Sequence, residues 1–183
     1  EDEKLTDTDN DFLTRPFSEE EVKAALFSMD SNRAPGPDNI PAEFYRFCWE
    51  IVKQDIMNLF MAFHEGTLDV ERLNCGIITL IPKVSGAKKI QEFRSIFLLR
   101  CPYKLITKVL DNRVAVFADK LISHHQNAFI KKRNIMDGIL TIHEVLHHTQ
   151  AKRKMGIVLK LDFEERTIRS IGISCLSVIK WGA

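Results

Sequence analysis

Hydrophobic residues recur along the chain with two different spacings. In "FSEEEVKAALFSMD" they return every three or four positions, which puts them on one face of a helix. In "CGIITLIPK" they form a short run rich in β-branched residues, which is typical of a strand. The whole pattern predicts helices at 17–30, 41–65, 102–121 and 134–154, and strands at 75–83, 92–99 and 155–163.

Local signals set the ends of these elements. Ser18 and Glu21 have capping-box spacing, and Phe17 precedes the cap as a hydrophobic staple would. The helix must end before "NRAPGPDNIP", because proline and glycine disfavour both helix and strand. Helices predominate and the strands are few, so we predict an α+β fold.

Charge is distributed unevenly along the 183 residues. Residues 1–30 carry ten acidic and three basic side chains, a net charge of −7, whereas 31–183 carry 15 acidic and 23 basic ones, a net charge of +8. We expect the acidic segment 1–15 to be disordered. The basic remainder suggests a polyanionic partner such as nucleic acid, although solvated surface lysines would give the same count.

Other features limit the class of protein. No apolar run reaches the roughly 18 residues of a membrane span, and the acidic start is unlike a signal peptide. The four cysteines form no C-x-x-C pair, which suggests reduced core residues. We therefore expect an intracellular protein, nuclear or cytoplasmic and not secreted, with no membrane association. The sequence indicates no stable protein partner.

Residues 143–147 read "HEVLH", the spacing of a zinc hydrolase helix with His143 and His147 as ligands and Glu144 as the base. A catalytic zinc site needs a third protein ligand. One family of zinc proteases supplies it six residues after the second histidine, where this chain has Arg153. A second supplies a glutamate further on, where Glu164 or Glu165 would have to serve although both follow a predicted strand. A zinc hydrolase is thus a remote alternative.

Six motifs follow one another in a recognisable order. They are "NRAPGPDNIPAEFY", "ITLIPK", "FRSIFLL", "YKLITKVLDNR", "LISHHQNAFIKKRNIMDG" and "GIVLKLDFE". Together they resemble the reverse transcriptase domain of non-LTR (LINE-type) retrotransposons, most closely those of flowering plants, over residues 12–165. The resemblance implies the helix-rich fingers and first palm strand of a right-hand polymerase at 16–165, with an incomplete palm. In that family the segment around "HEVLH" is a connecting helix.

The resemblance also implies roles for individual residues. Asp162 would be the first catalytic, metal-binding aspartate of the palm, and the backbone carbonyl of Phe163 a second metal ligand. Lys83 and Arg94 would hold the incoming dNTP, a role that suits cations. The alternative interpretations are that Asp162 is an ordinary acid at the end of a strand and that Lys83 and Arg94 are ordinary basic residues of the surface. In the intact family enzyme Mg²⁺ serves nucleotidyl transfer through two metal ions.

Further matches concern the RNA template and DNA primer. Arg33 and Arg133 stand at basic positions that would face the nucleic-acid backbone. Gln126 and Phe129 stand at positions that would support the template and nucleotide site.

The chain also departs from the family pattern. Asn39 and Lys132 replace glycines, and Ser95 replaces a proline. A lysine at a position that needs positive φ would strain its loop. After Glu165 the resemblance stops, so 166–183 form a divergent tail, which reads as though the reading frame or an exon join had changed.

Asp162 is the last aspartate of the sequence, so the palm Asp-Asp motif is missing from these residues. We therefore predict an inactive RNA-directed DNA polymerase fragment. A residual RNA- or DNA-binding module is the alternative. We also expect the strand at 155–163 to lack the sheet partners that the missing part of the palm would supply.

Overall fold

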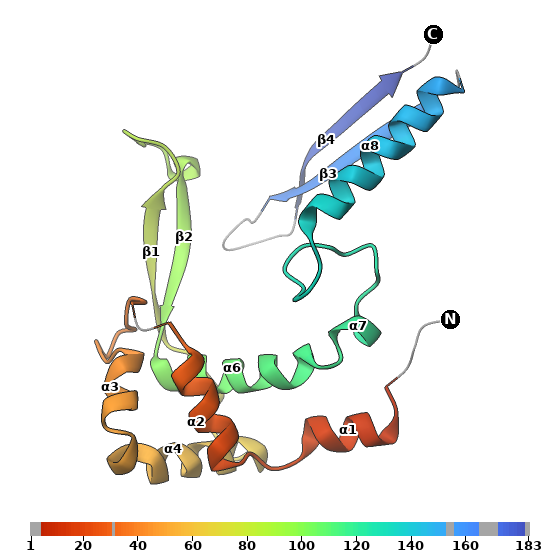
Figure 1. Cartoon of the computed structure of the whole chain (residues 1–183). Helices are drawn as coiled ribbons and strands as arrows, with labels where there is room; N and C mark the ends of the chain where they lie inside the picture. Colours follow the sequence, from red (N-terminus) through yellow and green to blue (C-terminus); the bar gives the residue numbers. More distant parts are fainter. Residues whose placement is uncertain (1–4, 31, 153–155, 165–171, 182–183) are drawn as a thin grey trace. The chain divides into compact units, whose positions relative to one another are not determined.

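The computed structural model describes residues 5–30, 32–152, 156–164 and 172–181, the last two ranges as backbone. The chain divides into two compact units, Glu1–Leu121 and Ile122–Ala183 (Figure 1). The first contains α1 (Asp7–Thr14), α2 (Glu19–Ser28), α3 (Ala42–Phe47), α4 (Trp49–His64), α5 (Val70–Leu73), β1 (Gly76–Pro82), the 3-10 helix η1 (Ile90–Glu92), β2 (Phe93–Leu99), α6 (Cys101–Ala115) and α7 (Ala118–Leu121). The second contains α8 (Ile135–Ala151), β3 (Gly156–Glu164) and β4 (Gly172–Trp181).

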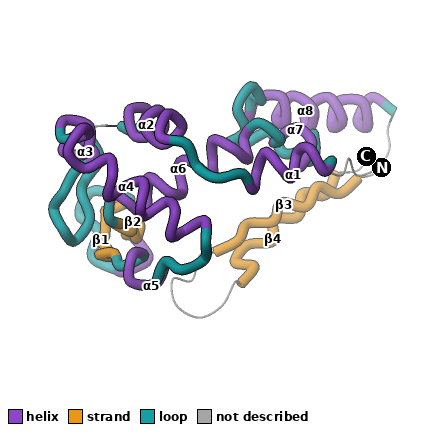
Figure 2. Tube along the Cα trace, turned by 90° about the horizontal axis from the view of Figure 1, so that it is seen from below, coloured by secondary structure: helices purple, strands orange, loops and turns teal. Residues whose placement is uncertain are grey.

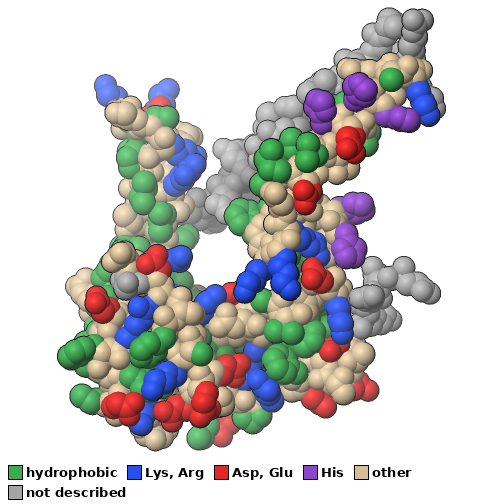
Figure 3. All heavy atoms as spheres, in the orientation of Figure 1, with side chains coloured by type: hydrophobic (Ala, Val, Ile, Leu, Met, Phe, Trp, Pro, Cys, Tyr) green, Lys and Arg blue, Asp and Glu red, His purple; other side chains and the backbone are tan. Residues whose placement is uncertain are grey.

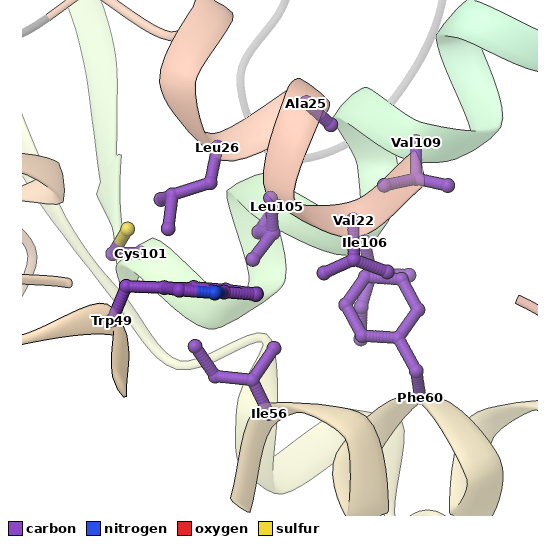
Figure 4. Packing of buried hydrophobic residues seen from close by; sticks show 10 residues of the cluster. All are labelled: Val22, Ala25, Leu26, Trp49, Ile56, Phe60, Cys101, Leu105, Ile106 and Val109. Carbon is purple, nitrogen blue, oxygen red and sulfur yellow. The ribbon is translucent and has the colours of Figure 1, made fainter. Parts of the chain in front are cut away.

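The core of the first unit lies between α2, α4 and α6, as the close view in Figure 4 shows. Each helix contributes an apolar stripe at helical spacing, and burying these stripes against one another is the main source of their stability. The buried members of this core cluster are Val22, Ala25, Leu26, Trp49, Ile56, Phe60, Cys101, Leu105, Ile106 and Val109.

The predicted helix at 41–65 is two helices, separated at Cys48. Its φ of −93° and ψ of 16° depart from helical values, and the N–H of Cys48 donates to the carbonyl of Phe44. The break changes the direction of the chain between two bulky neighbours. Trp49 lies in the core, whereas Phe47 is 92% exposed. The helix predicted at 102–121 is also two elements, α6 and α7.

The acidic N-terminal segment differs from the expected disorder, because Asp7–Thr14 form α1. Thr6 caps this helix through a capping box with Asp9, and acidic residues in the first turn suit the helix dipole. Two of the contacts of α1 are with residues that follow α6, namely Phe117 and Lys120 of α7. The rings of Phe12 and Phe117 meet edge to face at 5.6 Å, and the Asp9 carboxylate accepts from Lys120 at 2.9 Å.

The strands β1 and β2 form an antiparallel hairpin that extends away from the helices of the first unit (Figure 1), and Figure 2 views the hairpin nearly end-on. Gly76 pairs with Leu99 at its base, and Pro82 pairs with Phe93 near its free end. Apolar side chains are exposed on both faces of this two-stranded sheet. An isolated hairpin of this kind is marginal in water, so its attachment to the helices matters for its stability.

The loop "NRAPGPD" anchors the base of the hairpin. The ammonium group of Lys104 on α6 donates to the carbonyl of Ala34 at 3.1 Å. Asn39, which replaces the family glycine, has φ 57° and its N–H donates to the carbonyl of Gly36. The left-handed turn is therefore present with asparagine, a residue that tolerates it.

Gly36→Ala is expected to destabilise the first unit by about 1–3 kcal/mol, because a Cβ at Gly36 would lie 2.7 Å from backbone atoms of Leu99 and Arg100. Those atoms belong to the junction of β2 and α6 and cannot rotate away. Chemical denaturation followed by circular dichroism measures the change. Gly86→Ala is the control: it meets no atom within 4 Å but has φ 75°, so about 1 kcal/mol of backbone strain is expected there. A Gly36→Ala chain as stable as wild type would exclude this close packing.

In the second unit β3 and β4 form an antiparallel pair. The strand that ends near Asp162 was expected to lack the sheet partners of the missing palm, and residues 172–181 of the divergent tail supply a different partner for it. Residues 172–181 lack the strict apolar–polar alternation of a half-buried strand, because Ser174, Ser177 and Lys180 recur every three residues, so β4 was not predicted. The register shifts between Asp162 and Phe163, which pair with Cys175 and Ile173.

Candidate nucleic-acid interface

The free end of the β1–β2 hairpin is held together by the Glu92 carboxylate. It accepts hydrogen bonds from the backbone N–H groups of Lys88 at 2.7 Å and Lys89 at 3.2 Å. These two donors hold the pKa of Glu92 below its ordinary value. Glu92 was not among the predicted site residues, although a glutamate three residues after Lys89 at the start of a helical turn is a capping signal.

Lys83 and Arg94, the two residues matched to the nucleotide site, lie on the same face of the hairpin. Arg94 pairs with Ile81, and Lys83 follows Ile81 by two residues, so all three side chains share a face. The backbone N–H of Lys83 donates to the carbonyl of Glu92 at 2.7 Å, which continues the ladder past β1. The ammonium group of Lys83 donates to the carbonyl of Gln91 at 3.1 Å.

The hairpin combines positive charge with exposed apolar surface. Between Gly76 and Leu99 there are four basic residues and one acidic residue, Glu92. Figure 3 shows Lys and Arg side chains at its free end and hydrophobic side chains along its length. This combination suits a phosphate-rich ligand, because cations attract the phosphates and apolar groups contact sugars and bases.

Arg33 lies elsewhere in the first unit, in the loop at the base of the hairpin. It is exposed and lies 3.8 Å from the Asp30 carboxylate. The hairpin strands span about 20 Å between that loop and the end that carries Lys83 and Arg94. The structure therefore does not bring Arg33 together with the other two basic residues.

In the second unit, Arg133 organises the loop that precedes α8. Its guanidinium donates to the carbonyls of Ile122 at 3.0 Å, Ser123 at 2.6 Å and Gln126 at 2.9 Å. Three carbonyls gathered by one planar cation fix the path of the loop. The side chain of Gln126 reaches the carbonyl of Ala128 at 3.4 Å, a long contact. These three hydrogen bonds of Arg133 lie within its own loop.

Two residues of this loop have left-handed backbone conformations. Lys132, which replaces the family glycine, has φ 72°, so the position does require positive φ as expected. Phe129 has φ 64°, which is uncommon for a bulky residue, and its ring is fully exposed. An exposed ring held by a fixed loop is suited to stacking on a base.

Asp162 and Phe163 lie at the register shift of β3. Bulges of this kind are common beside active sites. Among residues 5–30 and 32–152, together with the described backbone, no group of three or more His, Cys, Asp and Glu could hold a metal ion. Mg²⁺ in polymerases is held by carboxylates together with substrate phosphates. The side chains of Asp162 and Phe163 are not among those that the structure describes, so their predicted role as metal ligands stays a prediction.

Two further features narrow the chemistry. Burial raises the pKa of the Cys101 thiol to about 11, which keeps the thiol protonated and unreactive. The prediction that the cysteines are core residues is wrong for Cys75, which is exposed. In the described part of the chain, no helix has the length and apolar character needed to cross a bilayer.

Comparison with known proteins gives one informative match. No protein-family model matches the chain. The chain is 28% identical over 156 residues to the "Transposon TX1 uncharacterized 149 kDa protein" of Xenopus laevis. The match covers 84% of this chain but only 12% of the Xenopus protein. The chain is therefore similar to a segment of a much longer transposon protein.

Proposed function

We propose that the chain is part of a retrotransposon reverse transcriptase domain, comprising its fingers and first palm strand. In this role the β1–β2 hairpin binds phosphate groups of nucleic acid or of a dNTP. The observation that carries the proposal is the placement of Lys83 and Arg94 on one face at the free end of a basic, apolar hairpin. The similarity to a transposon protein and the ordered motifs support it.

By itself the 183-residue polypeptide is expected to bind without polymerising. Nucleotidyl transfer needs two divalent metals, and Asp162 is the last aspartate of the sequence. Primer extension on an RNA template with Mg²⁺ and dNTPs should therefore give no product above a protein-free control. Extension that disappears in Asp162→Asn would contradict this part of the proposal.

Binding is tested with a fluorescent RNA–DNA hybrid by anisotropy over a series of salt concentrations. We expect micromolar affinity that falls as salt rises, because each contacted phosphate releases counterions. Lys83→Ala combined with Arg94→Ala should weaken binding by about tenfold or more and reduce the salt slope by about one to two units. Titration with a fluorescent dNTP then distinguishes the two sources of phosphate.

Lys53→Ala is the matched control. Lys53 on α4 is also basic and partly exposed, but its ammonium group lies 2.7 Å from Glu50 and 3.9 Å from Glu19, so it has no free charge to offer a phosphate. Its substitution should leave affinity unchanged. Equal affinity of the wild type and the double variant for both ligands would exclude the hairpin as the binding surface.

A further inference from the structure

The histidines of "HEVLH" remain unexplained by a nucleic-acid role. They lie on α8, a regular helix of 17 residues capped by the Asn134 side chain. His143, Glu144, His147 and His148 are all exposed, and they line one open depression on this helix. Histidine side chains gather on α8 in Figure 3.

Helix geometry divides these four side chains into two pairs. His143 and His147 are four residues apart, so their Cβ atoms lie about 6 Å apart on one face. Glu144 and His148 form a second pair of the same spacing, rotated by about 100° from the first. The imidazoles of the first pair can therefore converge on one ion, while His148 faces a different direction.

We propose that His143 and His147 form an exposed binding site for a first-row transition metal ion such as Zn²⁺, with Glu144 at its margin. Imidazole is a ligand suited to Zn²⁺, Ni²⁺ and Cu²⁺ and not to Mg²⁺. Two protein ligands leave the remaining coordination positions to water or to an external donor. This site is independent of the proposed polymerase ancestry.

The site differs from that of a zinc hydrolase. Catalytic zinc sites have three protein ligands and a shaped, dry cavity. Over the residues whose side chains are described, no third His, Cys, Asp or Glu completes such a set. The depression is open to solvent because its histidines are exposed. The inference is therefore reversible metal binding without hydrolysis.

The test is isothermal titration of the tag-free full chain with Zn²⁺ and with Mg²⁺. Zn²⁺ should bind, and Mg²⁺ should give no heat of binding at this site. His143→Ala and His147→Ala should each weaken Zn²⁺ binding by at least about tenfold, equivalent to about 1.4 kcal/mol. His148→Ala is the matched control on the same helix and should change affinity by less than about twofold.

A second measurement guards against variants that fail to fold. Zn²⁺ should raise the melting temperature of the wild type and of His148→Ala, because a ligand that binds only the folded state stabilises it. It should not do so for His147→Ala, whose helical circular dichroism without metal should match that of the wild type. Unchanged Zn²⁺ affinity in His143→Ala and His147→Ala, or equal losses in all three variants, would overturn the proposal.

Discussion

Replacing Arg113 by alanine is expected to destabilise the first unit by about 3–5 kcal/mol, the range seen when one partner of a buried ion pair is removed. Arg113 on α6 is 2% exposed, and it is the one charged residue buried in the described part of the chain. Two of its nitrogens donate to the Glu21 carboxylate at 2.7 and 2.8 Å. The loss leaves that partly buried carboxylate, whose side chain is 18% exposed, without its two hydrogen bonds from Arg113.

Arg113 also holds the connection between α1 and α2. Its guanidinium donates to the carbonyls of Leu13 at 3.0 Å, Arg15 at 2.7 Å and Pro16 at 3.0 Å, and it lies 4.2 Å from the centre of the Phe17 ring. All five donors of the planar fork can be used in this arrangement. Arg113→Lys keeps the positive charge but loses the planar guanidinium and its five donors, so this substitution should also be clearly destabilising.

Lys108→Ala is the control for a surface ion pair on the same helix. Lys108 and Asp111 lie 3.1 Å apart but are exposed, so the expected change in unfolding free energy is at most about 1 kcal/mol. Urea denaturation measures all three variants. A cost for Arg113→Ala no larger than that for Lys108→Ala would show that the buried network contributes little.

The same ion pair makes stability depend on pH. Chiefly the hydrogen bond from Arg113 lowers the pKa of Glu21 from its ordinary value of 4.5. A lowered pKa in the folded state contributes stability above pH 4.5, and this contribution is lost as the pH falls through the folded-state value. The difference in stability between wild type and Arg113→Ala should therefore narrow when denaturation is repeated below pH 4.5.

This network illustrates what local sequence rules leave out. The spacing of Ser18 and Glu21 predicted a capping box, and Ser18 does accept from the N–H of Glu21 at 3.2 Å. The Glu21 carboxylate, however, binds Arg113, a residue 92 positions away. Capping rules consider only neighbours within one helical turn, so no local pattern could identify that partner.

The hairpin and the left-handed residues were more predictable. The run rich in β-branched residues at 75–83 and the extended segment at 92–99 predicted β1 and β2 to within one residue of their ends. Asn39 and Lys132 were identified because they replace glycines, whereas the left-handed Phe129 carried no such signal. The pairing of β3 with β4 depends on contacts across the chain, which periodicity alone does not specify.

Phe60→Ala is the second substitution expected to have a large effect, with a cost of about 3–5 kcal/mol in unfolding free energy. Phe60 on α4 is completely buried within the core cluster. The Phe17 ring packs edge to face against it, with centroids 5.1 Å apart. Removing the ring removes buried apolar surface and leaves a cavity. Neighbouring side chains on the three packed helices cannot move far enough to fill that cavity.

Phe47→Ala is the matched control, because Phe47 is 92% exposed and its loss should change stability by less than about 0.5 kcal/mol. The core cluster and the hairpin are directly connected along the chain, because α6 begins at Cys101, after β2 and Arg100. Where Phe60→Ala is still folded, its affinity for the RNA–DNA hybrid should equal that of the wild type. The amount of hybrid that Phe60→Ala binds should fall only as its folded fraction falls. The double variant of Lys83 and Arg94 should instead bind weakly while it is fully folded. Affinity lost without unfolding in Phe60→Ala would instead place binding in the helical core.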